Sequence, residues 1–271
     1  MNPDLPDATS VQFQTMSTNK MLSIAVISYQ FDNLLTRTIT SLGSVPDRVE
    51  IILQLAKGAP NDYHQFQLKY ETMIEAGLMR ILPFGDDGIF SAMNRVRLAA
   101  TGEYLWFINS GDEFLSDLGL ERVLSHLTEA RSYGFRTAQV HGQDTFVRPS
   151  LRYKSPLPRQ IGHVGAVFHR SAYSMIAFNE RQSVSSDQDF TEQCFHQSGW
   201  QYVPEIIGVF QLDGVSSRYR FSDFKAFANE SRSLRVKFLL KMLLRLLVGT
   251  TWLHRILLFR KCDHVESSSV I

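Results

Sequence analysis

Residues 86–114 read DDGIFSAMNRVRLAATGEYLWFINSGDEF. Over residues 88–102 the apolar side chains recur at helical spacing, and Gly102 is expected to close this helix. Residues 103–109, EYLWFIN, are a short and nearly continuous apolar run, which is typical of a strand buried on both faces. The stretch therefore predicts a helix that leads directly into a buried strand.

A polar turn follows that strand, and its residues are Asn109, Ser110, Gly111, Asp112 and Glu113. The small residues allow the backbone to turn tightly, so that the next carboxylate projects into open space. Mg²⁺ and Mn²⁺ take one or two protein carboxylates together with phosphate oxygens and water. Asp112 therefore suits a metal ion that bridges the protein and a diphosphate. The alternative is that Asp112 or Glu113 caps the helix that follows.

The rest of the first half alternates strands and helices. Strands are expected at residues 22–29, 49–55 and 79–84, and helices at residues 32–42, 63–77 and 118–130. Asp32 or Asn33 is expected to cap the first of these helices, and Asn61 or Asp62 the second. This alternation predicts an α/β fold, a mostly parallel sheet with helices on both faces. Such sheets bind ligands beyond the carboxyl ends of their strands, where Asp112 is expected to lie.

The second half has a weaker pattern. Residues 135–142 and 145–154 are expected to form a pair of strands, residues 162–170 another strand, and residues 186–199 a helix. No internal repeat is present, and the length suits one large domain or one domain with an appendage.

Composition restricts the function classes. The chain has 271 residues, 44% of them hydrophobic, and a net charge of +1, so nothing global points to a nucleic-acid partner. The two cysteines, Cys194 and Cys262, form no CxxC pair and suit a reducing compartment. Residues 1–20 lack the basic start and apolar core of a signal peptide. We expect them to be a flexible extension, or Met16 or Met21 to be the true start, and the protein to stay in the cytoplasm.

The C-terminal segment is basic. Residues 232–261 contain eight Lys or Arg and no acid, which leaves 20 basic against 27 acidic residues elsewhere. Lys237, Lys241 and Arg245 recur at helical spacing on a mostly apolar segment that charges interrupt too often for a spanning helix. We expect residues 226–261 to form amphipathic helices on an anionic membrane surface, followed by a flexible tail at 262–271. The alternative is a helix pair that packs on the preceding domain or on a second subunit.

The stretch 86–114 resembles family 2 glycosyltransferases of the GT-A fold, in particular the small bacterial exopolysaccharide enzymes such as colanic acid glycosyltransferases. Their pattern is Asp-x-Gly-Ile-Tyr-x-Ala-Met-Asn, a helix, Thr-Gly-Glu, a strand, and Leu-Asn-Ser-Gly-Asp. The segments SIAVISY, GHVGAVFHR, SSDQDF and GVFQLDGVSS fit the family in the same order. The resemblance covers about residues 21–220 and implies a GT-A domain over 21–225.

The resemblance implies an inverting transfer from a nucleotide-sugar donor, with Mg²⁺ or Mn²⁺ held by Asp112 against the diphosphate. Asp86 would lie near the nucleotide, or would be a solvated turn residue. Gly88 would open a helix whose amides face phosphate. The other implied donor-side residues are Ser28, Tyr29, Gln54, Asn94, Asn109, Ser110 and Gly111. Asn94 either reaches the metal loop or lies on the wet helix face, whereas Met93 and Ile89 belong to the core.

On the acceptor side, the resemblance implies that Asp187 is the base and Asp189 its reserve. Ser-Ser-Asp before a helix is also a good capping sequence, which is the alternative for Asp187. His163 either contacts phosphate or acceptor, or is a satisfied core histidine. Asp213, Gly214 and Ser216 resemble the family's Gly-Gly-x-Ser loop, with Asp in place of the first Gly.

Three departures from the family pattern affect the donor side. The family follows its second strand with Asp-Gly-x-Ser-x-Asp, where this chain has LQLAKGAPND, with Gln54 or Leu55 in place of the first Asp. Ser91 replaces a frequent Asp, and Val96 a frequent Gly. An altered donor or a loss of activity would each account for these departures.

Three functions follow from these patterns. The first is a peripheral membrane enzyme at the inner face of the cell membrane that glycosylates a polyprenyl-phosphate-linked or saccharide acceptor. The second is an inactive relative that acts as a membrane-docked scaffold in a polysaccharide assembly complex. The third is a nucleotidyltransferase, which is disfavoured because SYQFDN after the first strand is not a Gly-rich phosphate loop.

Overall fold

In the computed structural model of the chain, the described residues are 20–56, 60–83, 85, 88–115, 119–182, 184–212, 224, 227, 230–258 and 262–266. The first half comprises β1 (Leu22–Ser28), α1 (Asn33–Ser41), β2 (Val49–Leu55), α2 (Pro60–Lys69), α3 (Glu71–Glu75), β3 (Met79–Ile81), α4 (Ile89–Ala99) and β4 (Tyr104–Asn109). The second half comprises β5 (Glu113–Phe114), α5 (Gly119–His126), β6 (Ser132–His141), β7 (Asp144–Arg148), β8 (Ala166–His169), α6 (Arg170–Tyr173), α7 (Ser186–Ser198), β9 (Trp200–Gln211), α9 (Arg232–Leu258) and β10 (Asp263–Glu266). Short 3-10 turns span Pro158–Gln160 and His163–Gly165.

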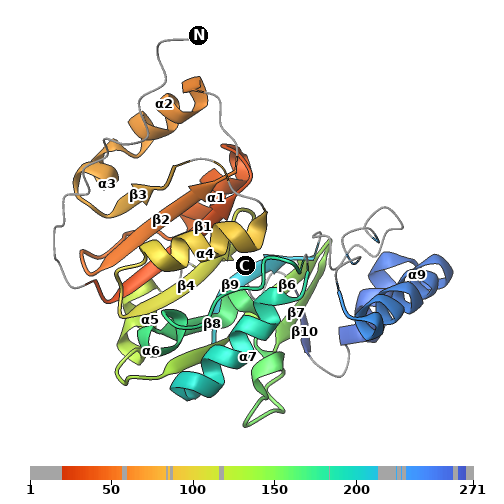
Figure 1. Ribbon diagram of the computed structural model, residues 1–271. Coiled ribbons are helices and arrows are strands. Elements are labelled where there is room, and N and C mark those ends of the chain that lie inside the picture. Colours follow the sequence, from red (N-terminus) through yellow and green to blue (C-terminus); the bar gives the residue numbers. More distant parts are fainter. Residues whose placement is uncertain are drawn as a thin grey trace.

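One sheet runs through the molecule in the order β10-β7-β6-β8-β4-β1-β2-β3, with β9 beside β6 and β5 (Figure 1). Strands β4, β1, β2 and β3 are parallel, as the alternating pattern predicts. The second half adds mainly antiparallel pairs, while β9 runs parallel to β6. The carboxyl ends of β1, β2 and β4 therefore meet at one edge of the sheet.

Helices cover both faces of this sheet, and each face has its own core. Alternate residues of β1, β2 and β4 point to α1 and α5 on one face, where Leu35 and Trp106 are fully buried. The remaining residues of the same strands point to α4 and α7 on the other face, where Met93 and Phe190 are buried. Because the strands are covered on both sides, their sequences are continuously apolar.

The helix caps and ends differ from the sequence expectations in several places. Asp32 caps α1 as predicted, because its Oδ1 accepts from the amide of Leu35 at 2.9 Å. Neither Asn61 nor Asp62 caps the next helix, since α2 begins at Pro60, a residue suited to a first helical turn. The single helix predicted over 63–77 breaks at Tyr70, whose ψ of 17° is not helical, into α2 and α3.

Gly102 does not close α4, which ends at Ala99. A Cβ atom on Gly102 would lie 2.5 Å from the backbone nitrogen of Ser23. The glycine is therefore needed for the close approach of the chain entering β4 to the start of β1, rather than for a helix cap.

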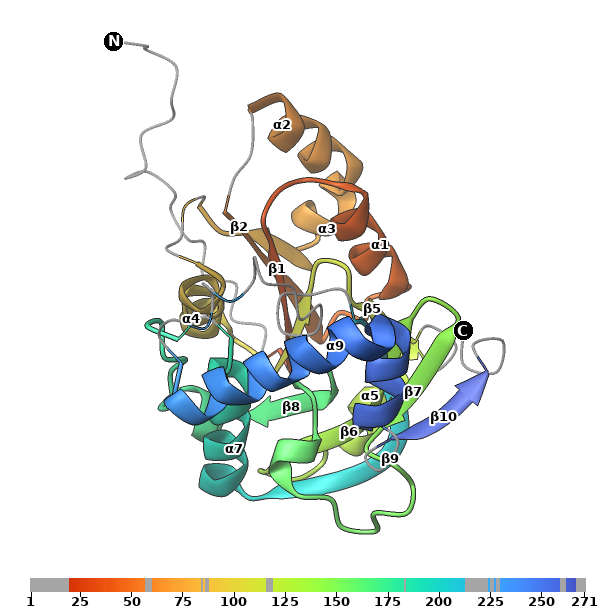
Figure 2. The same cartoon turned by 90° about the vertical axis from the view of Figure 1, so that its right-hand side faces the viewer.

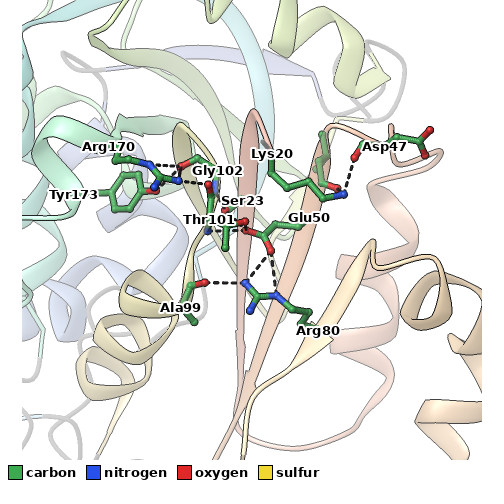
Figure 3. A network of polar contacts seen from close by, with 11 residues as sticks. Lys20, Ser23, Asp47, Glu50, Arg80, Ala99, Thr101, Gly102, Arg170 and Tyr173 are labelled. Carbon is green, nitrogen blue, oxygen red and sulfur yellow. Dashed lines mark hydrogen bonds and ion pairs between the residues drawn. The ribbon is translucent and has the colours of Figure 1, made fainter. Parts of the chain in front are cut away.

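A buried carboxylate joins the amino ends of the parallel strands (Figure 3). Glu50 of β2 accepts from the Ser23 hydroxyl at 2.6 Å, the Thr101 amide at 2.8 Å and the Thr101 hydroxyl at 2.6 Å. Its other oxygen accepts from Arg80 of β3 at 2.8 and 3.1 Å. The Ser23 oxygen in turn accepts from the Gly102 amide at 2.8 Å. The four parallel strands are thus connected at the edge opposite to their carboxyl ends.

The C-terminal segment adds a long helix and an edge strand. Helix α9 is interrupted at Gly249, whose φ of 77° is not helical, and it lies across the molecule with α7 near one end and β7 near the other (Figure 2). Residues 263–266, within the expected tail, form β10, which pairs antiparallel with β7. Among the described residues, no helix combines the length and apolar character needed to cross a membrane.

Replacing Glu50 with Ala should destabilise the fold by about 3 kcal/mol, because it strands buried hydroxyl and amide donors and the Arg80 guanidinium. Urea unfolding at neutral pH measures this loss. Burial raises the pKa of Glu50, but its hydrogen bonds and Arg80 outweigh this and hold the pKa below 4.5. The ionised group therefore stabilises the fold above pH 4.5, and this contribution is lost as the pH falls through the folded-state pKa.

Glu121→Ala is the matched control for this experiment. Glu121 forms an ion pair with Arg48 in which both side chains are about half exposed or more. Its loss should cost less than about 1 kcal/mol. An equal loss in both variants would contradict a central role for Glu50.

Candidate active site

Asp112 lies just beyond the carboxyl end of β4, in the turn between β4 and β5. Its amide donates to the Asn109 carbonyl at 2.9 Å, and its Oδ2 accepts from the Asn109 amide at 3.2 Å. The following residue, Glu113, belongs to β5, and α5 begins only at Gly119. Neither Asp112 nor Glu113 therefore caps the next helix, and that alternative is wrong.

Thr38 of α1 fixes this turn from the outside. Its hydroxyl donates to the Asp112 carbonyl at 2.7 Å and accepts from the Gly111 amide at 3.0 Å. Gly111 has a φ of 98°, a conformation that favours glycine. The predicted tight turn is thus present. No sequence pattern points to Thr38, because a buried threonine on an amphipathic helix is ordinary.

His163 lies between two carboxylates. Its Nε2 is 3.6 Å from Oδ2 of Asp112, and its Nδ1 is 3.3 Å from Oδ2 of Asp187 in the first turn of α7. The three side chains are 17%, 7% and 29% exposed, respectively. Three segments that are far apart in the sequence therefore place their candidate groups together.

The turn that carries His163 is fixed by β4. The indole nitrogen of Trp106 donates to the Val164 carbonyl at 2.7 Å. The ring of Phe210 in β9 stands edge-on to the imidazole, with 5.8 Å between ring centroids. Phe210 is a second residue for which the sequence offered no signal, since it is one apolar residue in an apolar strand.

The two carboxylates determine the charge of His163. Burial lowers the pKa of the imidazole, but the hydrogen bonds and charges of Asp112 and Asp187 outweigh it and raise the pKa to about 10. An imidazolium therefore balances part of the negative charge at neutral pH when no cation is present.

The side-chain amide of Asn109 can hydrogen-bond to Nε2 of His163 in either protonation state of the imidazole. Its Nδ2 lies 3.2 Å from Nε2 of His163, which is a hydrogen bond when Nε2 is unprotonated. Rotating the amide by half a turn presents Oδ1 to a protonated Nε2 instead. In the first orientation Oδ1 of Asn109 is buried with no hydrogen-bond partner in the described part of the chain.

The side-chain oxygens of Asp112 and Asn109 fit a hard divalent cation whose remaining ligands come from a bound molecule or from water. The Asp112 carboxylate and, in the orientation that pairs with neutral His163, the Oδ1 of Asn109 are both ligands that Mg²⁺ and Mn²⁺ accept. Within the described ranges, no group of three or more His, Cys, Asp or Glu side chains is placed to enclose a metal. Such a cation would therefore need phosphate oxygens or water to complete its coordination.

Other predicted donor-side residues have different surroundings. Gln54 is fully buried, and its Nε2 donates to the Pro83 carbonyl at 3.0 Å and the Leu55 carbonyl at 3.1 Å. Ser28 is buried and donates to the Gln30 carbonyl at 2.8 Å, whereas Tyr29 is exposed. Gly88 precedes α4 with a φ of 120°, and Ser110 donates its amide to β1.

Asn94 satisfies neither expectation. It is buried on α4, where its side chain accepts from the Phe178 amide at 2.9 Å and donates to the Phe178 carbonyl at 3.0 Å. It therefore braces the segment before α7 rather than the metal loop, and it does not lie on a wet face. Met93 is in the core as predicted, but Ile89 is 45% exposed, so its assignment to the core is wrong.

The two residues predicted for the acceptor side, Asp187 and Asp189, have different partners. Ser185 precedes α7 without a side-chain capping bond, and the Asp187 carboxylate reaches His163 instead of the helix amides. Asp189 is exposed and accepts from Gln182 at 3.0 Å. Asp86 and the loop with Asp213, Gly214 and Ser216 lie outside the described residues.

No family model matches the chain, and no curated protein matches it. Solved structures do. S. aureus TarS residues 1–349 superpose with a TM-score of 0.56 at 13% identity, over 87% of this chain and 74% of that one. The mannosyltransferase PcManGT from Pyrobaculum calidifontis, solved with GDP-Man and Mn2+, gives a TM-score of 0.56 at 14% identity, over 88% and 72%.

The chain has the GT-A fold. A sheet flanked by helices, as in these GT-A-type glycosyltransferases, confirms the predicted fold class. At this level of identity the likeness establishes the fold alone.

Removing either carboxylate beside His163 should lower the pKa of its imidazole from about 10 toward 6.5. NMR of the imidazole nitrogens in metal-free Asp187→Asn protein, from about pH 6 to about pH 11, measures this shift. Because the pKa is raised in the folded state, the associated stability is fully present below pH 6.5 and lost as the pH rises through about 10.

Glu113→Gln is the control variant for this titration. Glu113 is adjacent to Asp112 but pairs with Arg37. It should leave the imidazole titration unchanged. A wild-type imidazole that titrates near 6.5 would contradict the described arrangement.

Proposed function

We propose that this protein is an inverting glycosyltransferase that moves a sugar from a nucleotide-sugar donor to an acceptor hydroxyl. The observation that carries the proposal is the convergence of Asp112 and Asp187 on opposite nitrogens of His163, beyond the carboxyl end of a parallel strand. A transfer of this kind needs one group on the donor diphosphate and another on the acceptor proton. The GT-A fold is compatible with both.

Asp112 and Asn109 form the donor side in this proposal. They would hold Mg²⁺ or Mn²⁺, which would stabilise the charge that grows on the departing diphosphate. Structures with the same fold were solved with UDP-GlcNAc and with GDP-Man and Mn2+, and these ligands set the donor classes to test first.

Asp187 is the base in this proposal. Its Oδ2 faces Nδ1 of His163, and its Oδ1 would face the acceptor. As the acceptor oxygen bonds to the anomeric carbon, its proton passes to this carboxylate and the carbon–phosphate oxygen bond breaks. Attack from the face opposite the leaving diphosphate inverts the anomeric centre. His163 holds Asp187 in place for this step.

The acceptor side is proposed to lie at the inner face of the cell membrane. Helix α9 exposes a row of apolar side chains on one face, namely Val236, Leu240, Leu243 and Leu247, together with Leu246, Trp252 and Ile256. It carries basic residues and no acid. An amphipathic helix of this composition favours an anionic membrane surface. A polyprenyl-phosphate-linked acceptor in exopolysaccharide synthesis would be presented at that surface, and a free saccharide would not require it.

Asp112→Asn and Asp187→Asn should impair different steps. Asp112→Asn should weaken binding of the donor in the presence of Mn²⁺, because it removes the carboxylate that holds the cation. Asp187→Asn should leave donor affinity unchanged and reduce kcat by about 10²–10⁴-fold, the range typical of a lost general base. Calorimetry measures binding, and mass spectrometry of products from a screen of UDP-, GDP- and dTDP-sugars measures transfer.

Asp189→Asn is the control for the base, because Asp189 lies in the same helical turn but points to Gln182. It should keep wild-type turnover. Binding of partner enzymes without binding of any nucleotide or metal would instead favour the scaffold function.

Replacing Leu243 and Leu247 with Gln should weaken binding to vesicles rich in anionic lipid by at least about tenfold, since each exposed leucine loses favourable apolar burial. Cosedimentation with phosphatidylglycerol vesicles measures the change. Leu98→Gln is the matched control, because the exposed fraction of Leu98 lies between those of Leu243 and Leu247 but Leu98 belongs to α4. Equal binding by wild type and the double variant would exclude α9 as the membrane surface.

A further inference from the structure

Glu230 is a buried carboxylate just ahead of α9, and it is only 4% exposed. Its Oε1 accepts from the amides of Val184 at 2.8 Å and Ser185 at 3.4 Å. Its Oε2 accepts from the Ser185 hydroxyl at 2.6 Å. Through Glu230, the C-terminal segment thus forms hydrogen bonds with Val184 and Ser185, the two residues that lead into α7.

We infer that Glu230 is a positioning residue for Asp187, which rests on the proposed function of Asp187 as the base. Ser185 makes no side-chain cap of its own on α7, so its hydroxyl is free to bind Glu230. Asp187 stands two residues later, in the first helical turn. The direction in which the chain enters α7 therefore decides where the Asp187 carboxylate lies.

A second set of contacts makes this entry point sensitive to α9. Val184 packs against a small apolar cluster that contains Phe227, Phe238 and Leu253. Phe238 and Leu253 belong to α9 on either side of its kink at Gly249. The entry to α7 is therefore bound to α9 by apolar packing as well as by the Glu230 hydrogen bonds.

Glu230 does not act as a base itself in this arrangement. Both of its oxygens accept hydrogen bonds from the entry to α7, and the side chain is buried. Its contribution is to the placement of Asp187 against His163 and the acceptor. Misplacement of a reacting group by about 1 Å can cost on the order of 10²-fold in rate. Loss of the hydrogen bonds between Glu230 and the residues before α7 should therefore lower kcat, while the affinity for the donor at Asp112 should be unchanged.

Asp144 provides a matched control for the attachment of α9. It is buried at the start of β7 and accepts from Arg255 of α9 at 2.7 and 3.0 Å. This pair tethers the second half of α9 to the sheet, and neither of its side chains hydrogen-bonds a described residue of α7. A substitution at either Asp144 or Glu230 should weaken the attachment of α9. Only a substitution at Glu230 should also displace Asp187.

The experiment compares Glu230→Asp, Glu230→Gln and Asp144→Asn in the full chain. Glu230→Asp keeps the charge but is one methylene too short to reach Ser185, and we expect kcat to fall by about tenfold or more with unchanged donor affinity. Glu230→Gln keeps the length and an acceptor oxygen, and we expect kcat within about threefold of wild type. Asp144→Asn should also stay within that range.

Wild-type kcat in Glu230→Asp, or an equal fall in Asp144→Asn, would overturn the inference. If wild type transfers no sugar from any donor, the proposed function fails, and hydrogen exchange then tests the placement by itself. Amides of residues 184–190 should exchange faster in Glu230→Asp than in Asp144→Asn or wild type. Unchanged exchange there would overturn the inference independently of activity.

Discussion

The Glu50 carboxylate is the constraint on which the sheet depends. One ionised group receives donors from the start of β1, from Thr101 in the segment that leads into β4, and from β3, so it links four strands at their amino ends. In parallel strands, alignment at one end determines alignment at the other. The turn that carries Asp112 therefore lies beside the ends of β1 and β2 because of an interaction at the opposite edge. Gly102 permits this by bringing two backbones together where any side chain would clash.

The candidate site is organised by opposing charges. Two carboxylates near one another repel, and the positively charged His163 offsets much of that repulsion because it lies between Asp112 and Asp187. A divalent cation beside Asp112 would supply positive charge in its place, and Asn109 can present either a donor or an acceptor to the imidazole in response. Under the proposed function, the site would thus suit a positive charge that arrives with the donor and departs with the diphosphate.

The sequence predicts the first half of the fold because burial on both faces leaves strands that are apolar throughout, as in 22–29 and 49–55. It also predicts the tight turn at Asp112, because the small residues Ser110 and Gly111 directly follow such a strand. It does not predict where long-range partners lie. The two expectations for Asn94 are the metal loop and the wet helix face, yet it hydrogen-bonds Phe178, a residue 84 positions away that periodicity cannot locate. Thr38 and Phe210 were missed for the same reason, because their chemistry is ordinary and only their tertiary neighbours give them a role.

The two halves of the candidate site are supported by different parts of the chain. Asp112 is held by α1 and β4, which belong to the parallel core around Glu50. Asp187 is reached through the segment that Asn94 braces and through the C-terminal contacts of Val184. The core would keep Asp112 in place whether or not α9 is bound to the rest of the molecule. A movement of α9 would instead be transmitted to Asp187 through Glu230 and Val184. Helix α9 has an exposed apolar row and no acid, a composition that favours an anionic surface. Under the proposed function, the part of the site that would receive a membrane-borne acceptor is therefore the part whose placement depends on the helix that would contact that surface.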